Sequence, residues 1–88
     1  MRITLGNTYG GNLSNGGDRE ADIFAAGETV GTLTIRVCTD SGHRFGIATV
    51  WPKGISRGMI QREFKGTRGR MEMVEWVAEE LTAARSAR

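Results

Sequence analysis

Residues 32–38, TLTIRVC, alternate polar and apolar side chains strictly. Because successive residues of a strand point to opposite faces, the alternation predicts a strand whose Leu33, Ile35 and Val37 face a core. The turn-forming residues TDSG follow at 39–42, and residues 44–51, RFGIATVW, form a second run rich in β-branched and aromatic side chains. The two runs predict an antiparallel hairpin, which commits the chain to a β-sheet.

The chain then changes from a strand pattern to a helix pattern. Residues 59–65, MIQREFK, predict a third strand, and the loop GTRG separates it from the last segment. From Met71 onward, apolar side chains recur at the spacing of one helix face, with carboxylates on the opposite face. The predicted buried face holds Val74, Val77, Ala78, Leu81 and Ala84, with Met73 at its margin, and the exposed face holds Glu72, Glu75 and Glu79. This pattern predicts an α+β fold in which one C-terminal helix packs on an antiparallel meander of three to four strands.

Residues 1–31 carry weaker signals. Residues 2–5 alternate polar and apolar side chains and predict a short edge strand. Glycine and asparagine dominate residues 6–18, which predicts a mobile loop because both residues favour turns. Residues 18–28, DREADIFAAGE, fit one helical turn closed by Gly27. Since 88 residues support one modest core, we expect a single domain over residues 1–88.

Several functional classes are disfavoured by composition. No run of apolar residues is long enough to span a membrane, and the N-terminus lacks the apolar segment of a secretory signal. The single cysteine, Cys38, has no partner for an internal disulfide and is predicted to be a small buried residue of a strand. We therefore expect a cytoplasmic protein that does not bind membranes.

The sequence also lacks the patterns that carry catalysis. The single histidine, His43, lies beside Asp40 and Ser41 at the predicted hairpin tip, which is too solvated to align a nucleophile with a base. No pair of Cys or His residues has metal-ligand spacing, and the glycines form neither a phosphate-binding nor a dinucleotide-binding motif. We expect no enzymatic activity, no cofactor and no metal.

Charge is segregated along the chain although the net charge is only +2. Residues 1–43 hold three Arg against five Asp and Glu, a net charge of −2. Residues 44–70 hold seven Lys and Arg against one Glu, or +6, and residues 71–84 hold four Glu, or −4. A basic stretch of this kind attracts either a polyanion or an acidic protein groove, so charge alone does not identify the partner.

The basic stretch and the helix supply the predicted contact residues. Residues 66–70, GTRGR, precede the helix, where backbone N–H groups and two arginines suit a phosphate, or else form a flexible connection with solvated arginines. Trp76 lies between the acidic and apolar faces, either as an exposed anchor or as a closing residue of the core against Trp51 or the sheet edge. The predicted partner-binding residues are Arg44, Arg57, Arg62, Lys65, Arg68, Arg70 and Trp76.

Arg62 presents a conflict in the third strand. It shares the parity of Ile60 and Phe64, so if these two face the helix, Arg62 turns inward with them unless an edge position or a bulge releases it. If all three face outward instead, the sheet offers a basic and aromatic contact surface.

The segment REFKGTRGRMEMVEWVAEEL resembles the end of the arm-binding N-terminal domain of tyrosine-recombinase integrases, an AP2-like module of three strands and one helix. The resemblance rests on Phe64, Met73, Trp76, Ala78 and Glu79, with GTLTIRV and RFGIATVW as the earlier strands, and covers residues 32–84. It implies that the sheet enters a DNA groove. The residues that would carry this contact are Arg36, Arg44, Arg62 and Lys65.

In size and layout the chain is also similar to the small anti-CRISPR proteins that phages and mobile elements encode. We expect a non-enzymatic binding protein of this origin that binds and blocks a protein of a host nucleic-acid-handling or defence complex. The acidic helix face favours a protein partner because its carboxylates repel a phosphate backbone. The alternative is a DNA-binding module that uses a basic face of its sheet. The oligomeric state is left open.

Overall fold

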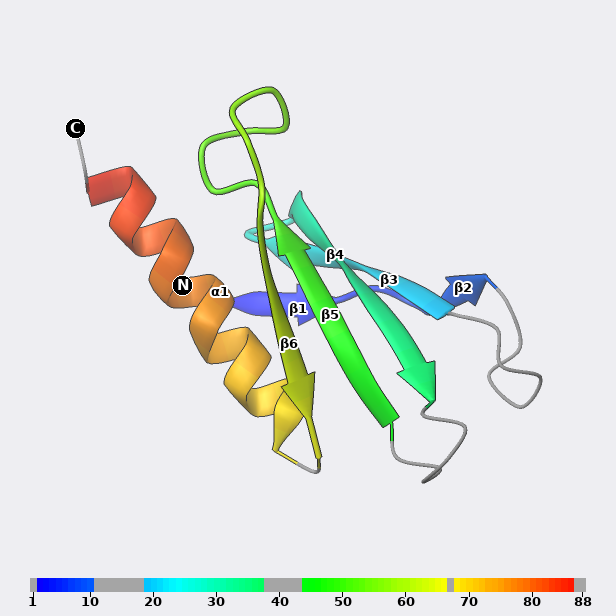
Figure 1. The fold of residues 1–88 in the computed structure, drawn as a ribbon. Helices are drawn as coiled ribbons and strands as arrows, with labels where there is room; N and C mark the ends of the chain where they lie inside the picture. Colours follow the sequence, from blue (N-terminus) through cyan, green and yellow to red (C-terminus); the bar gives the residue numbers. More distant parts are fainter. Residues whose placement is uncertain (1, 11–18, 38–43, 67, 87–88) are drawn as a thin grey trace.

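The structure is a computed structural model that describes residues 2–10, 19–37, 44–66 and 68–86. Figure 1 shows a strongly twisted sheet with a helix along one side. The elements are β1 Ile3–Leu5, β2 Tyr9–Gly10, β3 Arg19–Ala25, β4 Glu28–Val37, β5 Arg44–Val50, β6 Ile60–Lys65 and α1 Gly69–Ser86. The α+β class is therefore confirmed, as is the packing of an antiparallel sheet by a C-terminal helix.

The sheet is antiparallel, with the strand order β1-β3-β4-β5-β6 and the short β2 paired with β3. The helix contacts β5 and β6 and also β1, which lies at the other end of the strand order. The sheet must therefore curl, since one helix reaches both of its edges (Figure 1). The inner, concave face holds the core, and we call the other face the open face.

The core forms because small and branched side chains alternate on the inner face of each strand. Ala21, Ile23 and Ala25 of β3 are buried, as are Ala48 and Val50 of β5. All of these except Ala21 pack in one cluster with the buried side chains of the other elements, which are Ile3, Val30, Leu33, Phe64, Met73, Trp76, Val77 and Leu81. Ile23, Ala48 and Val50 are fully covered, so the centre of the core lies over β3 and β5.

The helix begins at Gly69, two residues before the predicted start, and its buried stripe differs from the predicted one. Met73 and Trp76 are buried with Val77 and Leu81, whereas Val74 and Ala78 are only partly buried. The buried face is thus turned toward Met73 and Trp76, because the curled sheet reaches around that side of the helix. Glu72 in the first turn and Arg85 in the last complement the helix dipole.

The prediction of a helical turn over residues 18–28 is wrong. Residues 19–25 form β3, in which Ala21, Ile23 and Ala25 lie buried at alternating positions. Ala26 and Gly27 close a two-residue hairpin loop to β4, and both have positive φ, of 52° and 80°. This is the geometry of a type I′ turn, which matches the twist of paired strands. The strand period was obscured in the sequence because the buried residues are mostly alanines.

The predicted meander contains the correct hairpin but too few strands. Residues 2–5 contain the edge strand β1 as expected, and β4–β5 and β5–β6 pair in antiparallel register as expected. The sheet gains β3 and, inside the predicted loop 6–18, the short strand β2. Residues 11–18 of that loop and the turn at 39–42 lie outside the described residues.

Tyr9 ties β2 to β3 on the open face. Its hydroxyl donates a hydrogen bond to Oδ1 of Asp22 at 3.2 Å. Partial desolvation of the ring raises the pKa of the Tyr9 phenol above 10.0, and the carboxylates of Asp22 and then Glu20 raise it further. A phenolate at this position would face two negative charges.

This geometry predicts an observable titration. Tyr9 is the single tyrosine of the chain, so ultraviolet absorbance follows it directly. We expect a pKa above 10.0 in the folded protein and the ordinary value in concentrated urea. The pKa of the Tyr9 phenol is higher in the folded protein than in the unfolded one. The protonated phenol therefore stabilises the fold below pH 10, and this stabilisation is lost as the pH rises through the folded-state pKa. Asp22→Asn should lower the folded pKa, and the exposed-site control Glu28→Gln should not. Equal pKa values in folded and unfolded protein would contradict the β2–β3 contact.

Candidate partner-binding surfaces

Three predicted cations gather where β6 passes into α1. Lys65 ends β6, Gly66 turns the chain with a φ of 79°, and the Gly69 N–H donates to the Gly66 carbonyl at 3.2 Å. This tight connection holds Lys65, Arg68 and Arg70 at one end of the molecule, and all three are exposed. We call these three residues the basic end.

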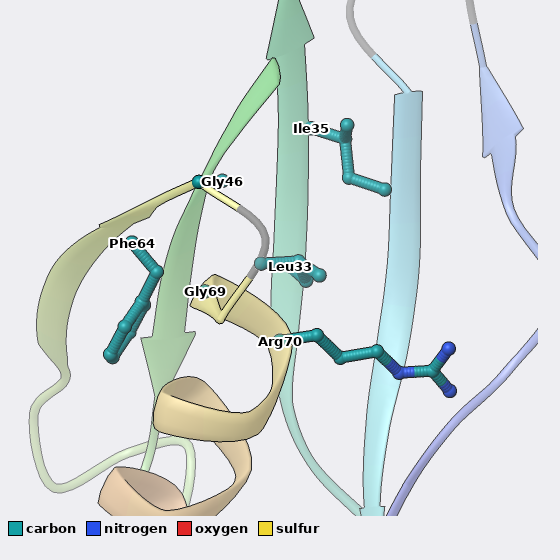
Figure 2. A pocket seen from close by; sticks show the side chains of 7 residues that line it. Leu33, Ile35, Gly46, Phe64, Gly69 and Arg70 are labelled. Atoms are coloured by element: carbon teal, nitrogen blue, oxygen red, sulfur yellow. The ribbon is translucent and has the colours of Figure 1, made fainter. Parts of the chain in front are cut away.

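A hollow of about 170 Å³ opens beside the basic end. Figure 2 shows it between the inner face of the sheet and the first turn of α1. It is lined by Leu33, Ile35, Gly46, Phe64, Gly66, Gly69 and Arg70. The hollow exists because α1 begins at Gly69 and extends toward the other end of the molecule. The helix therefore does not fully cover the inner-facing residues near the end of β4, Leu33 and Ile35. Most of the lining is therefore apolar, and one cation, Arg70, comes from the helix.

Glycine at position 46 shapes this hollow. A Cβ there would lie 2.8 Å from Cδ1 of Leu33, on the neighbouring strand β4. The absence of a side chain at position 46 thus allows Leu33 to lie flat against the sheet. Thr67 and the side chain of Arg44 lie outside what the structure describes, although the backbone of Arg44 begins β5 at the same end as Lys65.

The edge position of β6 resolves the conflict at Arg62. Arg62 pairs with the buried Ala48, so it lies on the inner side of the sheet with Phe64. Its side chain is nevertheless exposed, because β6 is the last strand and the guanidinium leaves over the edge. The guanidinium carbon lies 5.4 Å from the centre of the Phe64 ring, a cation–π distance.

Arg62 and the acidic helix face form one groove of about 230 Å³. Its lining consists of Arg62, Phe64, Glu72, Glu75, Trp76 and Glu79. The arginine therefore faces carboxylates of the same molecule. It does not form part of a basic sheet face, which removes one of the four residues that the DNA-groove interpretation requires.

Trp76 lies in the core. Its side chain is 8% exposed, and its ring centre lies 5.6 Å from that of Phe64 at an interplanar angle of 56°. Of the two interpretations of this residue, burial supports closure of the core against the sheet edge, here β6. The structure brings Trp76 to the wall of the acidic groove and does not bring it to the exposed surface of Arg68 and Arg70.

Arg57 lies at the other end of β6 from the basic end. It belongs to the β5–β6 loop, residues 51–59, together with the exposed Lys53. The predicted set of cations thus divides between two ends of the molecule. Met59, predicted to open the third strand, lies in this loop because β6 begins at Ile60. Lys53 and Ile55 were not predicted as contact residues, although a large apolar residue that follows Pro52 and Gly54 is unusual for a loop.

The open face of the sheet carries few described cations. By register, Thr32, Thr34 and Thr49 lie across its centre, and Glu20, Asp22 and Glu63 lie among them. Lys65 also lies on this side and pairs with Glu63 at 3.0 Å. Gln61 donates to Oγ1 of Thr49 at 2.9 Å. Among the described side chains this face is therefore acidic and hydroxylated, which is unfavourable for a phosphate backbone.

Within residues 2–10, 19–37, 44–66 and 68–86, no group of three His, Cys, Asp or Glu side chains is arranged to hold a metal ion. The helix in these ranges is not apolar enough over its length to cross a membrane. His43 and Cys38 lie outside the described ranges.

No protein-family model, curated protein or solved structure matches the chain. The resemblance of residues 32–84 to integrase arm-binding domains stays a prediction from sequence, as does the likeness in layout to anti-CRISPR proteins. The function of the chain is therefore inferred from the geometry and charge of its own surfaces.

Proposed function

We propose that this chain is a non-enzymatic binding protein that engages a protein partner through its basic end. The observation that carries the proposal is the apolar hollow of about 170 Å³ with Arg70 in its lining and Arg68 exposed nearby. Lys65, at the same end, lies on the open face and pairs with Glu63. An apolar pocket beside cations suits an apolar side chain flanked by carboxylates, since the pocket supplies desolvation and the cations steer association.

A protein fits this surface better than a nucleic acid. The acidic helix face, with Glu72, Glu75 and Glu79, follows the basic end directly along α1. A duplex laid across the basic end would bring phosphates toward these carboxylates, whereas a folded partner can place its own cations there. The acids on the open face weaken the alternative of a DNA-binding sheet in the same way.

The partner class that we propose is a protein of a nucleic-acid-handling or defence complex, blocked or modulated by occupation of its surface. Support for this class comes from the basic end and the acidic helix face, which carry opposite charges and follow one another along the chain. A protein that normally holds nucleic acid presents both a basic channel and acidic catalytic or metal-binding groups, and a small inhibitor with segregated charge complements both.

The basic end makes a specific prediction. Arg70→Glu should slow association with the partner roughly tenfold and reduce the salt dependence of the association rate, because a steering cation becomes a repelling anion. The partner is obtained by affinity capture with and without nuclease, and rates are measured by surface plasmon resonance. Arg2→Glu changes the net charge equally at a position outside the basic end and serves as the matched control.

Two outcomes would overturn the proposal. One is equal association rates for Arg70→Glu and Arg2→Glu. The other is capture that nuclease abolishes, together with a gel shift of duplex DNA whose affinity falls steeply with salt, since such a slope reports released counterions.

A further inference from the structure

The β5–β6 loop has a defined shape. The Trp51 N–H donates to the Val30 carbonyl at 2.9 Å, which fastens the start of the loop to β4. The Gly54 N–H donates to Trp51 at 3.1 Å, and the Arg57 N–H donates to Gly54 at 3.0 Å, so two turns follow each other. Gly54 and Gly58 adopt φ values of 105° and 92°, which other residues rarely adopt. A loop held in this way loses little conformational entropy on binding.

The loop exposes large apolar side chains. Ile55 is 78% exposed and Met59 is 60% exposed, and the two lie four positions apart along the loop. Two such side chains on one short, ordered loop form a candidate contact patch, because burying isoleucine or methionine away from water contributes favourably to the free energy of binding. Methionine also adapts its shape to a partner.

Two hollows flank this loop, and both are also lined by residues of the C-terminal half of α1. One, of about 420 Å³, is lined by Pro52, Lys53, Arg57, Gly58, Met59, Ile60, Glu80, Ala83 and Ala84. The other, of about 460 Å³, is lined by Glu28, Thr29, Val30, Trp51, Pro52, Gly54, Ile55, Leu81 and Arg85. The small side chains of Ala83 and Ala84 leave room beside the loop, and Pro52 lies between the two hollows as a shared wall.

The charges around the hollows limit what they can accept. Lys53 and Arg57 line the first hollow against the single carboxylate of Glu80. Arg85 and Glu28 both line the second. Cations therefore outnumber carboxylates by three to two, which favours an occupant that carries carboxylates beside its apolar groups.

We propose that residues 51–59 and the last turns of α1 form a second docking surface, which takes an apolar, acidic segment of a partner protein. The concave hollows suit inserted side chains, whereas a flat anionic membrane would meet Glu28 and Glu80 at their walls. The surface lies at the opposite end of β6 from the basic end, so this proposal stands independently of the proposed function.

The test starts from peptides of random sequence. A phage-displayed library is selected on the wild-type protein, and enriched peptides are synthesised with a fluorophore for anisotropy measurements. We expect the enriched peptides to combine large apolar residues with Asp or Glu. Ile55→Ser/Met59→Ser should weaken their binding about tenfold or more, because it removes both apolar contacts. Lys53→Glu/Arg57→Glu should abolish the preference for acidic peptides.

Met71→Ser is the matched control, since Met71 is 61% exposed on the first turn of α1, away from the loop. It should leave peptide binding unchanged. The proposal is overturned if no peptide is enriched, if the enriched peptides are basic, or if the double serine variant binds them as well as the wild type. It is also overturned if phosphatidylserine vesicles, or a second copy of the chain in sedimentation experiments, bind the wild type and not the double serine variant.

Discussion

Trp76→Ala should lower the free energy of unfolding by about 3–5 kcal/mol, one of the two largest effects that we expect from a single substitution in this protein. The indole is 8% exposed and packs on Phe64, between the helix and the edge strand β6. Its removal loses the transfer free energy of the ring and leaves a cavity that the sheet edge only partly closes. A domain of this size has about 5–15 kcal/mol of stability in total, so much of it would be lost.

Urea denaturation followed by circular dichroism measures this loss. The urea concentration at the midpoint of unfolding should fall. The slope of the free energy of unfolding against urea concentration should stay nearly the same, since the folded state buries a similar area. Met71→Ala on the same helix is the control, because Met71 is exposed and its truncation should change stability by less than about 0.5 kcal/mol. A stability of Trp76→Ala equal to that of the control would contradict the packing of α1 on β6.

Gly31→Ala should destabilise the protein by about 3 kcal/mol or more, through the backbone itself. Gly31 is buried on the inner face of β4, where it pairs with Val50 of β5 and Ile23 of β3. A Cβ at this position would overlap the carbonyl oxygen of Thr49 and lie 3.0 Å from Cα of Val50. Because these are backbone atoms, no rotamer change relieves the clash, and β4 and β5 must separate.

Gly69→Ala provides the comparison for this substitution. Gly69 is also buried, but a Cβ there would lie 3.5 Å from the nearest atoms of Phe64, an ordinary contact distance. Alanine also favours helix over glycine by up to about 1 kcal/mol, so the substitution should be neutral or stabilising. Thermal unfolding of the two variants distinguishes the sites. If Gly31→Ala were as stable as Gly69→Ala, the register of β4 against β5 would be incorrect.

The β4–β5 hairpin and the helix were predictable because each carries a strong local period. Leu33 and Ile35 alternate with threonines, and Val77 and Leu81 recur at helical spacing. The strand β3 was missed for the opposite reason. Its buried positions are Ala21, Ile23 and Ala25, and alanine carries little hydrophobic signal while it favours helix. Pairing with β4 overrides that preference.

The candidate surfaces depended on information that is not local. Lys65, Arg68 and Arg70 lie within one stretch of six residues, so their gathering at one end was expected. The hollow beside them was not, because Leu33, Gly46 and Phe64 come from three strands. Arg57 lies close to these cations in sequence and yet points to another surface, since β6 separates the two ends.

By itself, the sequence determined the α+β class, the antiparallel hairpin, the C-terminal helix and the separation of basic from acidic segments. These follow from side-chain period and charge, which act between neighbours along the chain. The tertiary structure alone decided that the sheet curls until both edges reach α1, which buries Trp76 and turns the helix stripe toward Met73. It also decided that Arg62 leaves over the edge of β6 and that Ile55 and Met59 stay exposed. Burial is a property of which elements meet, and a residue's own neighbours in sequence do not specify that meeting.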